Sequence, residues 1–212
     1  MNFTEKLAKA VEWAERNTVL VLNADYETIG NDIKDTYKSV GAAIFAYNKS
    51  VLDAECDDIA AIIMDLTSYM QYGLSGAVAL KSTLDYAAKK STLAFINTES
   101  AVTANETDTF LRAYLEPVDS EDVSETKRMP IKEGTFCCDA VTVASSVSTD
   151  VLYTLTDKTK TFKKGIFVSI PDGFYPDKDF SVKCPADGIC LSEASIEQRF
   201  SNLESHQSRP NP

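Results

Sequence analysis

The stretch "YETIGNDIKDTYKSVGAAIFAYNKSV", residues 26–51, carries the most regular apolar pattern in the chain and decides the fold class that we predict. Its apolar side chains return every three or four positions, with a mean step of about 3.6 residues, which is the α-helical repeat. The stripe consists of Tyr26, Ile29, Ile33, Tyr37, Val40, Ile44, Tyr47 and Val51. Nearly the same spacing continues to Met70, so the pattern predicts one unusually long helix or two helices that separate near "DAECDD" at 53–58.

Helical signals also flank this stretch. A first amphipathic helix is expected from Thr4 to Arg16, and a further helix is expected to end near Asn97. The short run "TVLVLN" at 18–23 fits either a strand or a buried helical turn. Residues 1–100 are therefore predicted to form an α-helical segment, arranged as a long-helix bundle or hairpin.

The chain changes character after residue 100. Residues 101–128 combine a short helix, which Pro117 ends, with a polar and acidic linker. Residues 129–195 contain short segments rich in Val, Ile, Thr and Phe between turn residues, a pattern typical of strands. These short segments predict a small antiparallel β-barrel or sandwich, and residues 196–212 are expected to form a polar tail. The expected fold class is α+β.

Two adjacent cysteines lie in one of the expected strands, "TFCCDAVTV" at 135–143. Zinc ribbons usually present pairs separated by two to four residues, whereas the pairs here are C-C and C-x₅-C, from Cys137, Cys138, Cys184 and Cys190. Neighbouring residues on a strand point to opposite faces, so we expect one cysteine on each face, with Cys137 outward if Phe136, Cys138 and Ala140 face inward. The pattern favours reduced thiols that fill space, with a zinc site and a disulfide as the alternatives.

Composition argues against several classes of function. The chain has 21 Lys and Arg residues against 32 Asp and Glu, a formal net charge of −11, which repels nucleic-acid phosphates. Its only histidine, His206, lies in the tail, so neither a Ser-His-Asp triad nor a His-based zinc site is expected. A Gly-rich nucleotide loop is also absent from the sequence. We therefore predict no catalytic residue, no cofactor and no bound metal.

One stretch, "DKTKTFKKG" at 157–165, is locally basic. Its candidate contact residues for an acidic partner are Lys158, Lys160, Phe162, Lys163 and Lys164. Lysines on a β-hairpin also prevent unwanted pairing of strand edges, and this second interpretation requires no partner.

These features together favour a non-enzymatic structural protein. Long amphipathic helices often pack against copies of themselves, so the apolar stripe of residues 26–51 is a candidate oligomer interface. We expect a building block of a homo-oligomeric assembly, most concretely a bacteriophage virion accessory such as a capsid decoration, head fibre, connector or tail component. Its expected partners are copies of itself and other assembly proteins, with neither nucleic acid nor a membrane. Synthesis is expected in the cytoplasm, followed by incorporation into the virion.

Two other functions remain open at this point. The first is a monomeric adaptor or ligand-binding module that uses the β-domain. The second is a carboxylate-dependent hydrolase of unrecognised fold. The structural interpretation rests on architecture alone, because no motif in the sequence carries a specific chemistry.

Overall fold

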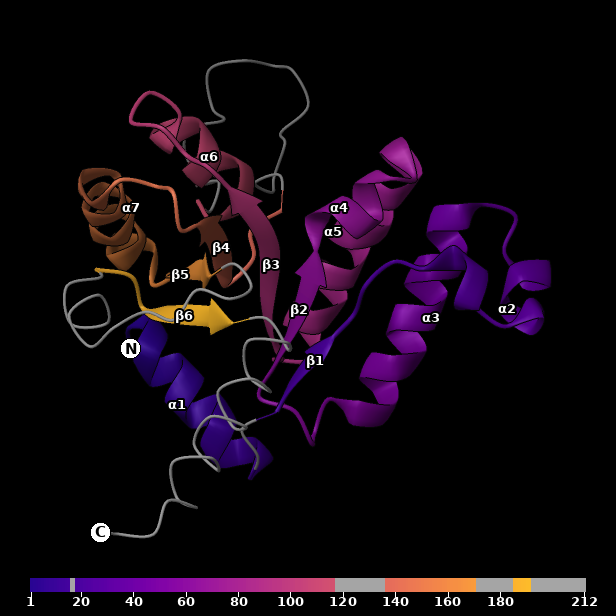
Figure 1. Ribbon diagram of the computed structural model, residues 1–212. Coiled ribbons are helices and arrows are strands. Elements are labelled where there is room, and N and C mark those ends of the chain that lie inside the picture. The colour runs from indigo at the N-terminus through magenta and orange to yellow at the C-terminus, as the bar shows by residue number, and fades with distance from the viewer. Residues whose placement is uncertain (16–17, 117–135, 171–184, 192–212) are drawn as a thin grey trace, which may run out of the picture.

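The computed structural model describes residues 1–15, 18–116, 136–170 and 185–191 (Figure 1). The strands are β1 (Val19–Val21), β2 (Ala61–Asp65), β3 (Leu93–Ser100), β4 (Ala140–Ala144), β5 (Gly165–Ile170) and β6 (Gly188–Leu191). The helices are α1 (Phe3–Ala14), α2 (Asn31–Thr36), α3 (Val40–Glu55), α4 (Leu66–Met70), α5 (Gly73–Lys89), α6 (Thr107–Tyr114) and α7 (Thr149–Phe162), with a 3₁₀ helix, η1 (Tyr26–Thr28).

The six described strands form one parallel sheet, in the order in which they follow one another along the chain. Parallel neighbours require crossover connections, and helices supply those between β1 and β5 (Figure 1). The strands are nearly continuous apolar runs, as in "AIIMD" of β2, because both faces of such a sheet are covered. A parallel sheet wound in sequential order is the arrangement found in (β/α)₈ barrels, and the described residues contribute six such strands.

The predicted α+β fold with an antiparallel β-module is therefore wrong. Strands β4, β5 and β6 pair in parallel with one another. The segment "DVLYTLT", expected to be a strand, belongs to helix α7. That helix buries Val151, Leu152, Leu155, Thr156 and Thr159, a helical spacing that is hard to see because threonines occupy two of the five positions. Val and Thr favour strands only weakly, and packing against the sheet overrides that preference.

The long helix expected from the stripe of residues 26–51 is also absent. The stripe is divided among η1, α2 and α3, and extended backbone at Ile29 and Tyr37 separates these elements. The Ser39 hydroxyl starts α3 by accepting a hydrogen bond from the Ala42 N–H at 3.2 Å. Helix α3 ends at Glu55, and beyond it Ile63 belongs to strand β2, while Leu66 and Met70 belong to helix α4.

Helix α1 closes the N-terminal end of the sheet. Its first residue, Phe3, lies edge-on to Phe95 and Phe167, with ring centroids 6.0 and 5.9 Å away. Gly165, at the start of β5, leaves room for this ring, since a Cβ there would lie 2.3 Å from the Phe3 Cε1 atom. Because α1 occupies this end, a site in the sheet is expected at the opposite, C-terminal ends of the strands.

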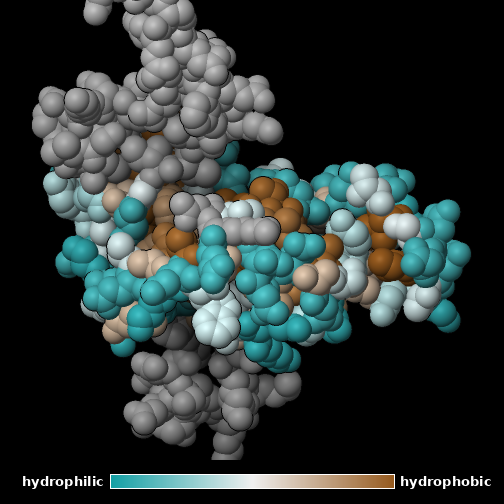
Figure 2. Space-filling view, turned by 90° about the horizontal axis from the view of Figure 1, so that it is seen from below, coloured by the Kyte–Doolittle hydropathy of each residue, from teal (hydrophilic) through white to brown (hydrophobic). Residues whose placement is uncertain are grey.

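The surface on the α1 side is mainly hydrophilic, with separate apolar areas (Figure 2). The most exposed large apolar side chains of the described residues are Trp13 and Leu74, at 80% and 82%. Among the helices that the structure describes, none is long and apolar enough to cross a membrane.

Candidate functional site

Polar side chains gather at the C-terminal ends of the first five strands, where parallel α/β sheets bind their ligands. Three of them, Asn23, Asp65 and Asn97, directly follow an apolar run of the sequence. They belong to what we call the strand-end network, which consists of Asn23, Asp65, Asn97, Glu99, Thr142 and Ser169.

Asp65 holds the β1–β2 side of this network in place. Its backbone N–H donates to the Asn23 Oδ1 atom at 3.1 Å. Its Oδ2 atom accepts the Ser68 N–H at 2.8 Å and caps helix α4, while its Oδ1 atom accepts from the Asn97 Nδ2 atom at 3.3 Å. These two bonds fix the orientation of the Asp65 carboxylate.

Asn97 connects Asp65 to the β3–β5 side. Its Nδ2 atom lies 3.4 Å from the Glu99 Oε1 atom, which also accepts from the Ser169 hydroxyl at 3.0 Å. The Thr142 hydroxyl donates to the Asn97 Oδ1 atom. One continuous set of hydrogen bonds thus runs from the end of β1 to the end of β5.

A buried tyrosine supports the neighbouring end of β1. The Tyr69 hydroxyl, which is fully buried, donates to the Leu22 carbonyl at 2.7 Å and accepts from the Asn48 Nδ2 atom at 2.8 Å. Burial raises the pKa of Tyr69, so this hydroxyl stays protonated and keeps its donor role. Tyr69 thereby fixes the backbone directly before Asn23.

The strand-end network combines two carboxylates, two carboxamides and two hydroxyls, and none of its six side chains is cationic. These groups can accept and donate hydrogen bonds to amides, carbonyls and hydroxyls of a ligand, and the carboxyl groups of Asp65 and Glu99 can also transfer a proton. Over the described ranges of the chain, no three His, Cys, Asp or Glu side chains are grouped as a metal site requires.

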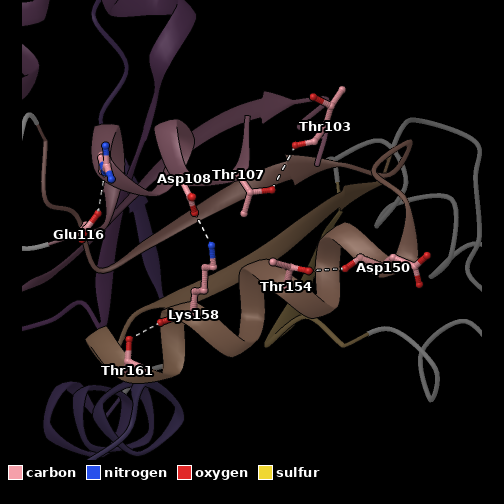
Figure 3. A network of polar contacts seen from close by, with 9 residues as sticks. Thr103, Thr107, Asp108, Glu116, Asp150, Thr154, Lys158 and Thr161 are labelled. Carbon is pink, nitrogen blue, oxygen red and sulfur yellow. Dashed lines mark hydrogen bonds and ion pairs between the residues drawn. The ribbon is translucent and has the colours of Figure 1, made fainter. Parts of the chain in front are cut away.

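The predicted partner-contact residues lie elsewhere, on and just after the second half of α7. Lys158 pairs with Asp108 of helix α6 (Figure 3). Lys164 pairs with Asp139 at 3.2 Å, and the Lys163 carbonyl accepts from the Lys6 ammonium at 3.1 Å. The hairpin interpretation of this stretch is wrong because the segment is helical. The contact of Lys158, Lys160, Phe162, Lys163 and Lys164 with an acidic partner stays a prediction.

Most of the predicted oligomer stripe packs inside the molecule. Ile29 and Ile44 are 4% and 1% exposed. Four further members are partly buried against the same core, namely Tyr26, Ile33, Val40 and Val51. Tyr37 and Tyr47 are the exposed members, at 42% and 39%, and contact of the stripe with another copy stays a prediction.

The cysteine pair lies just before β4, where the backbone breaks the strand alternation. Cys137 has a left-handed backbone, with φ of 49°. Cys138 is buried, and its thiol lies 3.3 Å from the Tyr114 and Ala140 carbonyl oxygens. Both are free thiols, as is Cys56. Cys184 lies outside the described residues, so the expectation that it and Cys190 are reduced stays a prediction, with a disulfide between them as the alternative.

Sequence reasoning missed the whole strand-end network. A signal existed, because "LVLN", "IIMD" and "AFIN" are apolar runs that each end in Asn or Asp. A polar residue directly after a buried parallel strand is typical of a ligand site. The second and third runs lie in segments for which helical spacing is predicted, and the first fits either a strand or a helical turn, so the three are not recognised as neighbouring strands.

Comparison with known proteins relates the chain to one enzyme. No family model matches it. Orotidine 5'-phosphate decarboxylase of Clostridium novyi is 26% identical over 167 residues, which are 77% of this chain and 51% of that protein. The enzyme of Clostridium acetobutylicum is 24% identical over 164 residues, with the same coverage. The chain spans about half the length of these curated relatives.

Solved structures show the same fold. OMP decarboxylase of Leishmania donovani superposes with a TM-score of 0.59 at 14% identity, over 90% of this chain and 69% of that chain. The orotidine 5'-monophosphate decarboxylase of Plasmodium berghei gives a TM-score of 0.59 at 14% identity, over 97% and 73%. This likeness shows a fold shared with these decarboxylases.

The predicted non-enzymatic bacteriophage virion component is therefore wrong, because the relatives in sequence are enzymes. The expected incorporation into a virion is wrong for the same reason. The alternatives are contradicted too, since the described residues form no antiparallel β-domain and the relatives are named as decarboxylases rather than hydrolases.

Proposed function

We propose that this chain is an enzyme of the orotidine 5'-phosphate decarboxylase type, with the strand-end network as the part of the site that contacts the pyrimidine and ribose. The observation that carries the proposal is the sequence similarity to the clostridial decarboxylases over 77% of the chain. The polar network at the C-terminal ends of five parallel strands supports it, because this is where enzymes of this winding bind substrate.

The reaction sets clear demands on such a site. The bond between C6 of the pyrimidine and its carboxylate breaks, carbon dioxide leaves, and the electron pair stays on C6 until a proton arrives. Asp65 and Glu99 are the ionisable groups of the network and hence its candidate proton donors. Asn97 can hold the ring through its amide and carbonyl groups.

The substrate phosphate requires a different part of the protein. Phosphate groups in barrels of this winding are frequently held after strands 7 and 8, beyond the six strands that the structure describes. The strand-end network, which contains two carboxylates and no cation, would repel a phosphate placed directly against it. We therefore assign the network to the base and ribose.

The test is turnover of orotidine 5'-phosphate by the purified full chain, followed through the loss of the orotate chromophore and the release of carbon dioxide. Asn97→Ala is expected to lower kcat/KM at least about tenfold, because one hydrogen bond to the ring is lost. Asn31→Ala, at an exposed position on α2, is the matched control and should change little. Absence of turnover, together with absence of uridine 5'-phosphate binding, contradicts the proposal.

A second candidate follows from the charge of the network. A network whose six side chains include two carboxylates and no cation suits an uncharged nucleoside better than an anionic nucleotide. Calorimetry with uridine and uridine 5'-phosphate distinguishes the candidates. Tighter binding of the phosphate supports the decarboxylase, whereas equal or tighter binding of uridine supports an enzyme that acts on an uncharged nucleoside.

A further inference from the structure

Strand β3 contains an irregularity next to the strand-end network. Asn97 pairs with Thr142 of β4, but the next pair is Ser100 with Val143. Thr98 and Glu99 are therefore extra residues on the β3 side, which is the arrangement of a β-bulge. Glu99 has φ of 46°, a left-handed backbone that L side chains adopt only when their surroundings hold them there.

The hydroxyl of Thr142 pairs the backbone of this bulge. Its oxygen accepts from the Thr98 N–H at 3.1 Å and from the Glu99 N–H at 3.3 Å. Thr98 completes the arrangement, because its own hydroxyl donates to the Thr142 carbonyl and accepts from the Ser100 N–H at 3.2 Å. All three amide groups of the bulge are thus paired through threonine hydroxyls.

These bonds also determine which way Asn97 is turned. A hydroxyl oxygen has two lone pairs and one proton, and the two amides of the bulge occupy both lone pairs of Thr142. Thr142 can therefore only donate its third hydrogen bond, so Asn97 must present its carbonyl oxygen to it. The amide nitrogen of Asn97 is consequently turned toward Asp65 and Glu99.

We propose that Thr142 is a positioning residue of the proposed substrate site. By accepting from the two amides of the bulge, it fixes the backbone conformation of Glu99. By donating to the Asn97 carbonyl oxygen, it fixes the direction in which the Asn97 amide nitrogen points. The inference rests on the proposed function for the identity of the ligand. Thr142 itself is 2% exposed and acts through these two residues.

Three variants test this role. Thr142→Val keeps the shape and removes the hydroxyl, while Thr142→Ser restores it. Thr156→Val is the matched control, because Thr156 is 5% exposed on α7 and, among the described residues, its hydroxyl bonds to the Leu152 carbonyl of its own helix. If Thr142→Val does not fold, Thr142→Ala replaces it.

The first measurement is made without ligand. Amide hydrogen exchange at Thr98 and Glu99 should be about tenfold faster in Thr142→Val than in the other two variants, which corresponds to the loss of one ordinary hydrogen bond. The ¹⁵N resonance of the Asn97 side chain should move in Thr142→Val alone. Unchanged exchange and an unchanged Asn97 resonance in Thr142→Val would overturn the proposal.

The second measurement is the Kd of uridine 5'-phosphate. Thr142→Val should weaken binding about tenfold, whereas Thr142→Ser and Thr156→Val should bind as the wild type does. Equal binding by Thr142→Val contradicts the positioning role. If the wild type itself binds no uridine 5'-phosphate, the proposed function fails, and the measurements without ligand still decide the role of Thr142.

Discussion

At the scale of single residues, the Asp53 carboxylate on helix α3 accepts hydrogen bonds from three side chains. It accepts hydrogen bonds from the Lys90 ammonium at 2.6 Å, the Tyr86 hydroxyl at 2.5 Å and the Lys49 ammonium at 2.9 Å. These three bonds hold the pKa of Asp53 well below its usual range. The bond from Lys90 lowers this pKa most, followed by those from Tyr86 and Lys49.

This pKa predicts how the cluster responds to pH. A carboxylate whose pKa is lowered in the folded state stabilises the protein above its unfolded pKa of about 4 and loses that effect as pH falls through the folded value. Asp53→Asn should therefore lower the Tm at pH 7, and the difference from wild type should shrink below about pH 4. Thermal denaturation at several pH values measures this, and a difference that grows in acid contradicts it.

The two adjacent cysteines should differ in reactivity. Burial raises the pKa of Cys138, so its thiol stays protonated at neutral pH and reacts slowly. Cys137 is partly exposed and should react faster. Native labelling followed by peptide mass spectrometry checks this order, and Cys137→Ser confirms the assignment of the fast site. Fast labelling of Cys138 in the folded protein would show that its burial is not maintained in solution.

At the scale of elements, local signals placed several helices but not the strands between them. Thr4–Arg16 was expected as a helix and α1 spans Phe3–Ala14, because its apolar stripe lies on one face. The strands β2 and β3 were hidden because fully buried parallel strands lack the alternation that distinguishes a strand from a helix. The strand-end network could not be assembled for the same reason, since it depends on which strands are neighbours.

Packing of helix α1 on the sheet predicts a coupled pair of substitutions. Gly165→Ala should destabilise the protein by about 1–3 kcal/mol, because the new methyl group meets the Phe3 ring. Phe3→Ala should cost about 3–5 kcal/mol through the cavity it leaves. In the double variant the alanine at 165 should cost much less than it does alone. Urea denaturation of the four proteins measures the coupling, and strict additivity contradicts the contact.

At the scale of the whole molecule, one sheet draws strands from both sides of the acidic segment 101–128, so the core of the described residues is continuous. The net charge of −11 follows directly from composition, but it does not point to a site built from Asn, Asp, Glu and Thr. Such residues are common everywhere in the sequence. The six residues of the strand-end network differ from the other polar residues only because the fold brings them together at the ends of five strands.

The stripe of residues 26–51 supplies the last prediction, because its members are divided between the core and the surface. Ile44→Ala should destabilise the protein by about 2–5 kcal/mol, as expected for a fully buried side chain. The double variant Tyr37→Ser, Tyr47→Ser should leave both stability and native mass nearly unchanged, since two exposed tyrosines fall far short of the roughly 800 Å² per partner that a stable interface buries. Urea denaturation and sedimentation at several protein concentrations measure both effects. A fall in native mass in the tyrosine variant would show that the exposed end of the stripe holds copies of the chain together after all.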